Sequence, residues 1–363
     1  MRQWVEHHPH WPRLTRSIAG KWLDEGLTER CITRDLEWGV PVPREGFDHK
    51  VFYVWFDAPI EYIGAALEWA DADPDGRDYQ RWWKDSGVTY TQFMAKDNVP
   101  FHTVFFPAMV LGTGEPWNLP HQVKSFHWLT YYGGKFSTSQ HRGIFLDDAL
   151  SLFDADMWRY YLLANAPEND DSSFTWALFA GVVNKDLVGV FGNFVNRTLK
   201  LTASQFGPRI PLGGTPGALE RQFQADCQAA VDRYRASFSH LEYRKAVRAL
   251  RDLWSLGNVY LDRQAPWTVA ATDRAQAAMV LRTAISAMAV FAVAAAPVIP
   301  FAAARVLKAL GLDEQRTLDD WPVINLAAPM GGRPFALQDP LFQRIAPGEI
   351  EELETRYRGQ ESL

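Results

Sequence analysis

Cysteine is scarce in this sequence, since only Cys31 and Cys227 occur among 363 residues. Two cysteines so far apart cannot build a disulfide framework or a zinc site with four cysteine ligands. Small disulfide-rich secreted domains are therefore excluded, and the cysteine usage indicates a reducing, cytoplasmic compartment.

An excess of positive charge is also missing. Lysine and arginine number 37 against 43 acidic residues, which gives a formal net charge of −6. This balance excludes a generally polycationic nucleic-acid binder, although a local basic face remains compatible with it. His7, His8 and His10 have no cysteine or carboxylate pattern beside them, so we expect a solvated segment there. The sequence shows no zinc or other metal site.

Membrane signals are weak. The first eight residues contain no apolar stretch, so no signal peptide is expected. The run from Ala284 to Ala304 is uncharged, but it is rich in alanine and contains Pro297 and Pro300. A buried bundle helix ended by these prolines accounts for it better than a membrane span.

What the sequence has in quantity is aromatic residues, with 15 tryptophans in a chain that is 47% hydrophobic. The length predicts two or three domains. Residues 1–155 have the pattern of a mixed α/β domain, in which strands alternate with helices as in an open parallel sheet. We expect a helix at 13–26 and strands at 51–56, 92–95 and 124–131.

Residues 156–325 have the pattern of an all-helical domain. Two apolar stripes recur at helical spacing, at Leu187, Val190, Phe191, Phe194 and Val195, and again at Ala246, Leu250, Leu253, Trp254, Gly257 and Leu261. A Pro/Gly-rich loop at 207–217 separates them. Residues 326–363 are expected to form a Pro/Gly-rich linker and a charged helix at 348–360.

Three segments could carry chemistry. Asp57 follows a predicted buried strand, where ligands bind in parallel sheets, but it could equally cap a helix. Lys96, Asp97 and His102 follow another strand, and His102 could be purely structural. The loop 133–143 offers glycines, Lys135, hydroxyls, His141 and Arg142 for a phosphate, although a solvated surface loop would look the same.

Taken in order, these segments resemble methionyl-tRNA synthetases, which are class I aminoacyl-tRNA synthetases. The resemblance extends from about residue 12 to residue 350. It rests on the segments Phe52–Ile60, Ala95–Asp97 with His102, Lys135–Ser139 in place of the KMSKS loop, Asp154–Leu162, Asn193–Arg197, Gln264–Trp267 and Pro340–Ile345. It implies the second half of a Rossmann-type catalytic domain followed by a helical-bundle anticodon-binding domain.

The resemblance also implies a function, methionine–tRNA ligase, with ATP and Mg²⁺, methionine and tRNA-Met as its ligands. The methionine pocket would be formed by Trp55, Ala58, Pro59, Tyr62, His102 and Phe106. Arg34, Lys96 and Asp97 would lie near ATP. The phosphates would contact Lys135, Phe136, Ser137, Thr138 and Ser139, of which Lys135, Ser137 and Ser139 act with Arg34 in catalysis. The anticodon would be read by Asn193, Arg197 and Trp267.

The sequence departs from the family pattern at several points. The His-x-Gly-His element that grips ATP phosphates in class I synthetases does not occur. Thr138 stands where the second KMSKS lysine is usual, so His141 or Arg142 would have to replace its charge. Glu61 stands where glycine is common.

These departures leave three readings open. One hypothesis is that the chain is a truncated form of the enzyme that is inactive alone. Another is that it is one half of a split enzyme, whose separate N-terminal chain carries the missing His-x-Gly-His element. As a third possibility, it is a non-catalytic tRNA-binding paralogue.

Overall fold

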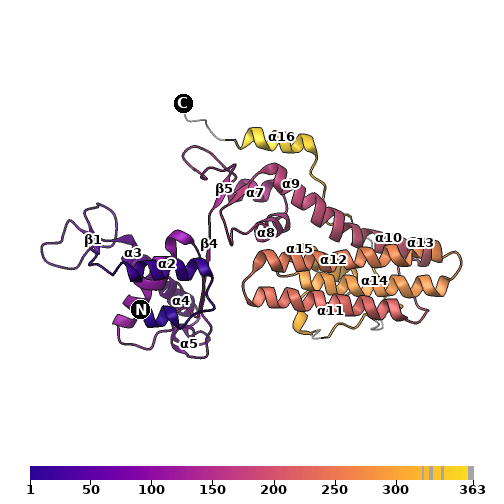
Figure 1. The fold of residues 1–363 in the computed structure, drawn as a ribbon, viewed down its shortest axis with the longest axis horizontal. Helices are drawn as coiled ribbons and strands as arrows, with labels where there is room; N and C mark the ends of the chain where they lie inside the picture. Colours follow the sequence, from indigo (N-terminus) through magenta and orange to yellow (C-terminus); the bar gives the residue numbers. More distant parts are fainter. Residues whose placement is uncertain (321–322, 327–329, 337–338, 359–363) are drawn as a thin grey trace. The chain divides into compact units, whose positions relative to one another are not determined.

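The computed structural model describes residues 1–320, 323–326, 330–336 and 339–358. These form two compact units (Figure 1). Unit 1 comprises Met1–Trp128 with Pro167–Asp171, and unit 2 comprises Leu129–Ala166 with Ser172–Leu363. The functional boundary at residue 155 stays a prediction. Residues 327–329, 337–338 and 359–363 of the predicted C-terminal segment lie outside the described residues.

Unit 1 mixes short helices with short strands. Its helical segments are α1 (Arg2–Glu6), α2 (Arg13–Asp24), α3 (Val54–Asp57), η1 (Ala58–Ile60), α4 (Glu61–Asp71), α5 (Tyr79–Lys84), η2 (Lys96–Asn98), η3 (Phe101–Phe105) and α6 (Phe106–Gly112). Its strands are β1 (Thr33–Arg34), β2 (Val51–Phe52), β3 (Thr91–Ala95) and β4 (Gln122–Phe126). The helix predicted at 13–26 and the strand predicted at 92–95 are confirmed.

The centre of unit 1 is the parallel pair β3–β4, in register from Thr91 opposite Gln122 to Ala95 opposite Phe126. Helix α2 packs on β4 through Thr15, whose hydroxyl lies 2.7 Å from the Ser125 hydroxyl. Because β3 leads directly into η2, the parallel pairing places Lys96 and Asp97 immediately after a strand end, as the sequence predicts.

The strand predicted at 51–56 is wrong beyond its first two residues. β2 ends at Phe52 and pairs antiparallel with β1, and Val54–Asp57 form a helical turn. In a short apolar run, periodicity alone does not distinguish a buried strand from a buried helix. Here the run turns helical because its aromatic side chains pack on another helix: Phe56 lies 6.4 Å from Phe105 in an edge-to-face contact. Asp57 therefore ends a helix rather than a sheet strand.

The strand predicted at 124–131 is divided in two. β4 ends at Phe126 in unit 1, and β5 (Leu129–Tyr131) belongs to unit 2, where it pairs parallel with β6 (Ser172–Phe174). The two glycines that follow do end the strand, and Gly133 adopts a positive φ of 77°.

The rest of unit 2 is helical. Its segments are α7 (Leu146–Leu152), α8 (Ala155–Ala164), α9 (Trp176–Val182), η4 (Val183–Gly192), α10 (Asn193–Phe206), α11 (Ala218–Ser239), α12 (Tyr243–Gln264), α13 (Pro266–Val269), α14 (Arg274–Ala295), α15 (Pro300–Ala309), η5 (Leu318–Asp320) and α16 (Pro347–Arg356). Helix α16 lies within the segment predicted as a charged terminal helix, whose last residues, 359 and 360, are outside the described part.

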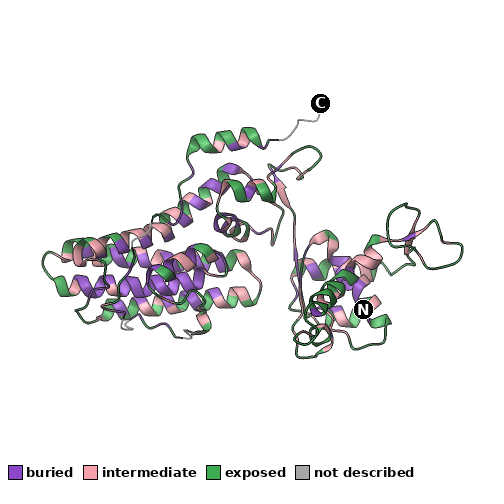
Figure 2. Ribbon diagram, turned by 180° about the vertical axis from the view of Figure 1, so that it is seen from behind, coloured by how far each residue is buried: buried purple, intermediate pink, exposed green. Residues whose placement is uncertain are grey.

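Helix α14 forms the core of the bundle. Every residue from Ala277 to Ala295 other than Arg282 is buried (Figure 2). Trp176–Phe206 and Arg274–Ala295 are long and apolar enough to cross a membrane, but 94% of the most apolar stretch of α14 is buried inside the protein. The predicted buried helix is thus confirmed, and Pro300 begins α15.

Candidate functional site

Unit 1 brings the predicted methionine-binding side chains together on two helical segments. Trp55, Ala58, Pro59 and Tyr62 follow one another along α3, η1 and α4, and His102 and Phe106 lie on η3 and α6. The Tyr62 ring contacts both His102, at a centroid distance of 5.8 Å, and Phe106, at 6.2 Å. The Trp55 ring stacks on Phe101 of η3 at 4.3 Å. The result is an aromatic wall suited to a polarizable apolar side chain.

The tautomer of neutral His102 follows from its two hydrogen bonds. Its Nδ1 lies 2.9 Å from the Asn98 carbonyl oxygen, which can only accept, so Nδ1 carries the proton. Its Nε2 then accepts from the Tyr62 hydroxyl, also at 2.9 Å. Burial lowers the pKa of His102, and burial together with Glu61 raises the pKa of Tyr62. The pair is therefore neutral at pH 7.

The predicted ATP-site residues of unit 1 are held by different partners. Lys96 donates to Asp171 at 2.8 Å and lies 4.1 Å over the Trp128 ring, and its hydrogen bond lowers the pKa of Asp171. Asp97, beside it in η2, is exposed. Arg34 lies in β1, with its guanidinium 4.0 Å from the Tyr53 ring centroid.

In unit 2, the loop Lys135–Ser139 forms a closed turn. Ser137 and Arg142 exchange two backbone hydrogen bonds, of 3.0 and 2.9 Å. The Phe136 ring packs on Tyr131 at 5.6 Å. Lys135, Thr138 and Ser139 are exposed. The turn thus presents a cation and hydroxyls to solvent, which is a suitable arrangement for binding phosphate.

The two residues that could replace the missing lysine charge differ in their surroundings. Arg142 lies against the base of the loop, where its Nη2 donates to the Tyr131 carbonyl at 3.1 Å and its Nε is buried without a partner. A side chain at Gly134 would meet this guanidinium, which would then have to move. His141 is exposed and has a φ of 49°.

The N-terminal histidines bond to backbone carbonyls. His8 Nδ1 lies 2.7 Å from the Trp4 oxygen, and His10 Nε2 lies 3.0 Å from the His121 oxygen. Burial lowers the pKa of His8. Across the described ranges, no group of three or more histidine, cysteine or acidic residues is arranged to hold a metal ion.

The predicted anticodon-reading residues lie on a seam between two parallel helices of unit 2. Three polar pairs bridge η4 and α10 to α12: Asp186 with Arg251 at 2.6 Å, Asn193 with Asn258 at 3.1 Å, and Arg197 with Asp262 at 2.9 Å. The partners are 65 residues apart in every pair. This constant separation means that the two helices run in the same direction and in register.

Trp267 lies at the end of this seam. Ala265 adopts a left-handed conformation, which ends α12, and Pro266 begins α13 at once. The sharp turn leaves the Trp267 ring 43% exposed, with the Arg197 guanidinium 5.0 Å from its centroid. Asn193 and Arg197 of α10 thus lie along the same seam as Trp267 of α13.

Two further polar residues of this seam were not predicted from the sequence. Asn258 receives the Asn193 amide and donates its own to the Val190 carbonyl at 3.1 Å, and Asp262 binds Arg197. Their spacing of four residues on α12 matches the spacing of Asn193 and Arg197 on α10. The equal spacing can be seen in the sequence, but no sequence pattern indicates that α10 and α12 pack in register.

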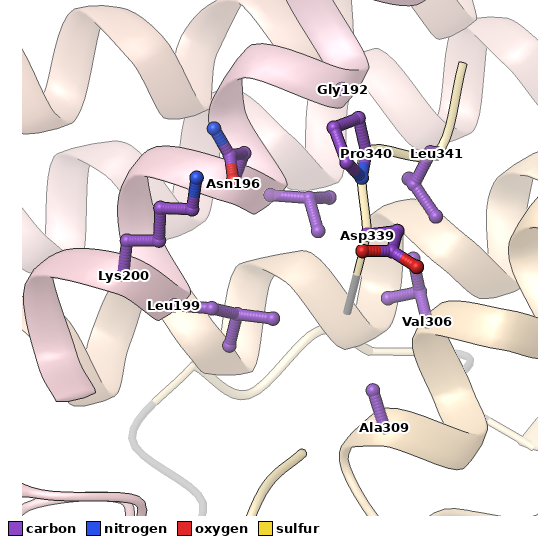
Figure 3. Close-up of a pocket in the computed structure, with 10 residues that line it drawn as sticks. Gly192, Asn196, Leu199, Lys200, Val306, Ala309, Asp339, Pro340 and Leu341 are labelled. Carbon is purple, nitrogen blue, oxygen red and sulfur yellow. The ribbon is translucent and has the colours of Figure 1, made fainter. Parts of the chain in front are cut away.

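A small hollow beside α10 (Figure 3) is not a ligand site. It is lined by Gly192, Val195, Asn196, Leu199, Lys200, Val306, Ala309 and residues 339–341. It has room for about one water molecule.

Comparison with known proteins gives the family. Residues 1–199 match the model of tRNA synthetases class I (M), and residues 210–362 match the anticodon binding domain of methionyl tRNA ligase. The chain is 50% identical to methionine–tRNA ligase 1 of Acaryochloris marina over 99% of its own length and 64% of the relative. It is also 50% identical to the methionine–tRNA ligase of Caulobacter vibrioides, covering 65% of that protein.

Solved structures agree with this. Mycobacterium tuberculosis methionyl-tRNA synthetase in complex with methionyl-adenylate superposes with a TM-score of 0.80 at 25% identity, over 93% of this chain and 65% of the other. The chain therefore spans about 64% of the length of its curated relatives, whose additional length lies in the same polypeptide as the matched part. That gives no support to a separate N-terminal chain. By both family models and these relatives, the chain belongs to the methionyl-tRNA synthetase family of class I.

Proposed function

We propose that this chain takes part in methionine–tRNA ligation as a cytoplasmic enzyme. In the first step a methionine carboxylate oxygen attacks the α-phosphorus of ATP, forming methionyl-adenylate and releasing pyrophosphate. In the second, the methionyl group passes to the 3′ end of tRNA-Met and AMP leaves. The observation that carries the proposal is the neutral Tyr62–His102 pair beside Phe106, because these uncharged aromatic groups suit contact with a polarizable apolar ligand.

The side chains of unit 1 are proposed to hold methionine. Tyr62 and His102 fix one another, so the aromatic wall is ordered before methionine binds, which reduces the entropic cost of binding. Trp55, which stacks on Phe101, is proposed to contact methionine as well. Asp97, exposed in η2 just after β3, would accept hydrogen bonds from ribose hydroxyls.

The loop of unit 2 is proposed to bind the phosphates of ATP. Lys135 and the hydroxyls of Ser137, Thr138 and Ser139 would stabilise the negative charge that develops as pyrophosphate leaves. ATP would supply its Mg²⁺ on its own phosphates, as phosphate-bound Mg²⁺ needs few protein ligands. Arg34 and Lys96 are proposed as further contacts to ATP and adenylate.

The seam of unit 2 is proposed to read the anticodon of tRNA-Met. Asn193 and Arg197 offer hydrogen-bond donors to base edges, and Trp267 offers a ring on which an unstacked base can lie. A non-catalytic tRNA-binding role is the second candidate, because this surface is complete within unit 2 and does not need the ATP loop.

Lys135→Ala tests whether the loop Lys135–Ser139 acts on the phosphates of ATP. In a preparation that exchanges pyrophosphate into ATP with methionine, this change should lower kcat at least tenfold and leave the methionine KM unaltered, because the charge acts on the transition state. Lys84→Ala is the control, since Lys84 is engaged with Glu115 on the surface of unit 1. A raised methionine KM with unaltered kcat would mean that the loop does not act on phosphate.

Residues 1–363 alone are proposed to exchange little pyrophosphate, since they contain no His-x-Gly-His element to grip ATP. Strong methionine-dependent exchange by this polypeptide would contradict that proposal.

A further inference from the structure

Helix α16 is hydrogen-bonded to the residue from which the chain enters the loop Lys135–Ser139. The Tyr132 hydroxyl donates to Oε1 of Glu354 in α16 at 2.7 Å. Tyr132 directly follows β5 and stands three residues before Lys135. Both residues belong to unit 2, so this contact lies within one compact body. Nothing in the sequence between them indicates it.

Tyr132 adopts a backbone conformation that needs support. Its φ is 49°, in the left-handed region that side chains other than glycine rarely adopt. Such a residue persists only where its surroundings hold it. Its N–H donates to the Phe174 carbonyl at 3.0 Å, and its hydroxyl accepts the Trp176 N–H at 3.1 Å. The next residue, Gly133, donates its N–H to the Ser173 hydroxyl at 2.9 Å.

Helix α16 is itself anchored to the same place. Leu353 and Tyr357 are buried, and the Tyr357 ring lies 5.7 Å from the Trp176 ring. The Trp176 indole N–H donates to the Tyr131 hydroxyl at 3.1 Å. The last residue of β5 and helix α16 therefore share Trp176 as a common support.

In the hydrogen bond between Tyr132 and Glu354, Tyr132 is the donor and Glu354 the acceptor at physiological pH. Burial, and next the bond to Glu354, raise the pKa of Tyr132 well above its usual range. The phenol thus keeps its proton and donates it, and the Glu354 carboxylate accepts. A hydrogen bond to a charged acceptor is stronger than one between neutral groups.

We propose that Tyr132 and Glu354 form a latch by which α16 positions the loop Lys135–Ser139. Both are positioning residues: Tyr132 sets the direction in which the chain leaves β5, and Glu354 holds Tyr132 in its left-handed conformation. The catalytic consequence rests on the function proposed above. A segment or partner that moved α16 would release Tyr132 and thereby change the order of the loop.

Hydrogen exchange of the loop amides tests the latch directly. Tyr132→Phe and Glu354→Ala should each speed exchange in residues 133–142 by about tenfold, because a hydrogen bond to a charged acceptor is lost. The double variant should exchange no faster than Tyr132→Phe alone, because that change already removes the bond to Glu354. Glu354→Gln keeps an acceptor and should restore much of the protection. Glu351→Ala, on an exposed position of the same helix, is the matched control and should match the wild type.

Kinetics of the same variants test the consequence. In a preparation that exchanges pyrophosphate, Tyr132→Phe and Glu354→Ala should lower kcat about tenfold, with the methionine KM and anticodon stem-loop binding unaltered. Unaltered loop protection in both variants would overturn the latch. Faster loop exchange with unaltered kcat would overturn its positioning role. If no preparation that contains this chain exchanges pyrophosphate, the proposed function fails, and the amide protection alone decides whether the latch exists.

Discussion

The guanidinium of Arg197 lies 5.0 Å from the centre of the Trp267 ring, and its Nη2 lies 2.9 Å from Asp262. The arginine is thus held from two sides on a surface that stays partly open to solvent. A base that stacks on Trp267 would meet a donor group already in place, which lowers the entropic cost of recognition.

Trp267→Ala should weaken binding of a CAU anticodon stem-loop by ~1–3 kcal/mol, the usual contribution of one base stacked on an aromatic ring. Arg197→Ala should also weaken it. Titration against CAU and scrambled loops at two salt concentrations measures both effects, with Trp82→Ala as the control, an exposed tryptophan of unit 1. Equal binding of both loops by the wild-type protein would end the anticodon assignment.

Asp262→Asn should raise affinity for CAU and scrambled loops alike, because it removes a negative charge and leaves the Arg197 charge uncompensated. The gain should be roughly 0.2–1 kcal/mol, as for other exposed ion pairs, and the salt dependence should steepen. Asp226→Asn, on helix α11, is the control for net charge. A loss of affinity for CAU alone would show instead that Asp262 contacts a base.

Thr138→Lys should speed adenylate formation about tenfold, since it places a second cation on the loop that we propose to face the developing phosphate charge. Single-turnover formation of adenylate measures it. Thr138→Gln controls for side-chain length. If the rate does not change and His141→Ala lowers it, the exposed histidine already supplies this charge.

The stability of the protein should fall as pH drops below about 6.5, the ordinary pKa of histidine, in a manner that depends on His102. The folded pKa of His102 is lowered, so the unfolded chain binds more protons in this range and folding loses free energy. Urea unfolding at pH 7.5 and 5.5 should show a smaller decline for His102→Gln. The pKa of His8 is also lowered, but His8 is present in both the wild type and His102→Gln, so it contributes equally to the two declines. Equal declines would contradict the neutral Tyr62–His102 pair.

Asp156→Ala should cost about 2 kcal/mol of unfolding free energy, because the buried carboxylate caps α15. Its oxygens accept the N–H groups of Ala302 at 2.7 Å and Phe301 at 3.4 Å. Asp156→Asn should cost less, since one acceptor remains. Denaturant unfolding measures both, and Asp154→Ala, which removes an exposed carboxylate, should have little effect.

Helical periodicity placed two helical stretches of unit 2 and its buried core helix, but it did not delimit the other helices. The stripe through Leu250, Leu253 and Trp254 lies on α12, and the uncharged run after Ala284 is in the buried helix α14. Such patterns record which side of a helix is buried, and that information is local. Periodicity failed at 54–57, where an apolar run fits a strand and a helix equally and packing against η3 decided between them.

The sequence by itself determined that most of unit 2 is helical, the ordered motifs that identify the family, and the residues that the resemblance assigns to the site. Only the tertiary structure decided which of these residues meet. Asp262 reaches Arg197 because α10 and α12 pack parallel and in register, and Glu354 reaches Tyr132 because α16 packs on α9. Side-chain spacing along one helix encodes its buried face, whereas the choice of a distant partner depends on how whole elements pack, which no local pattern specifies.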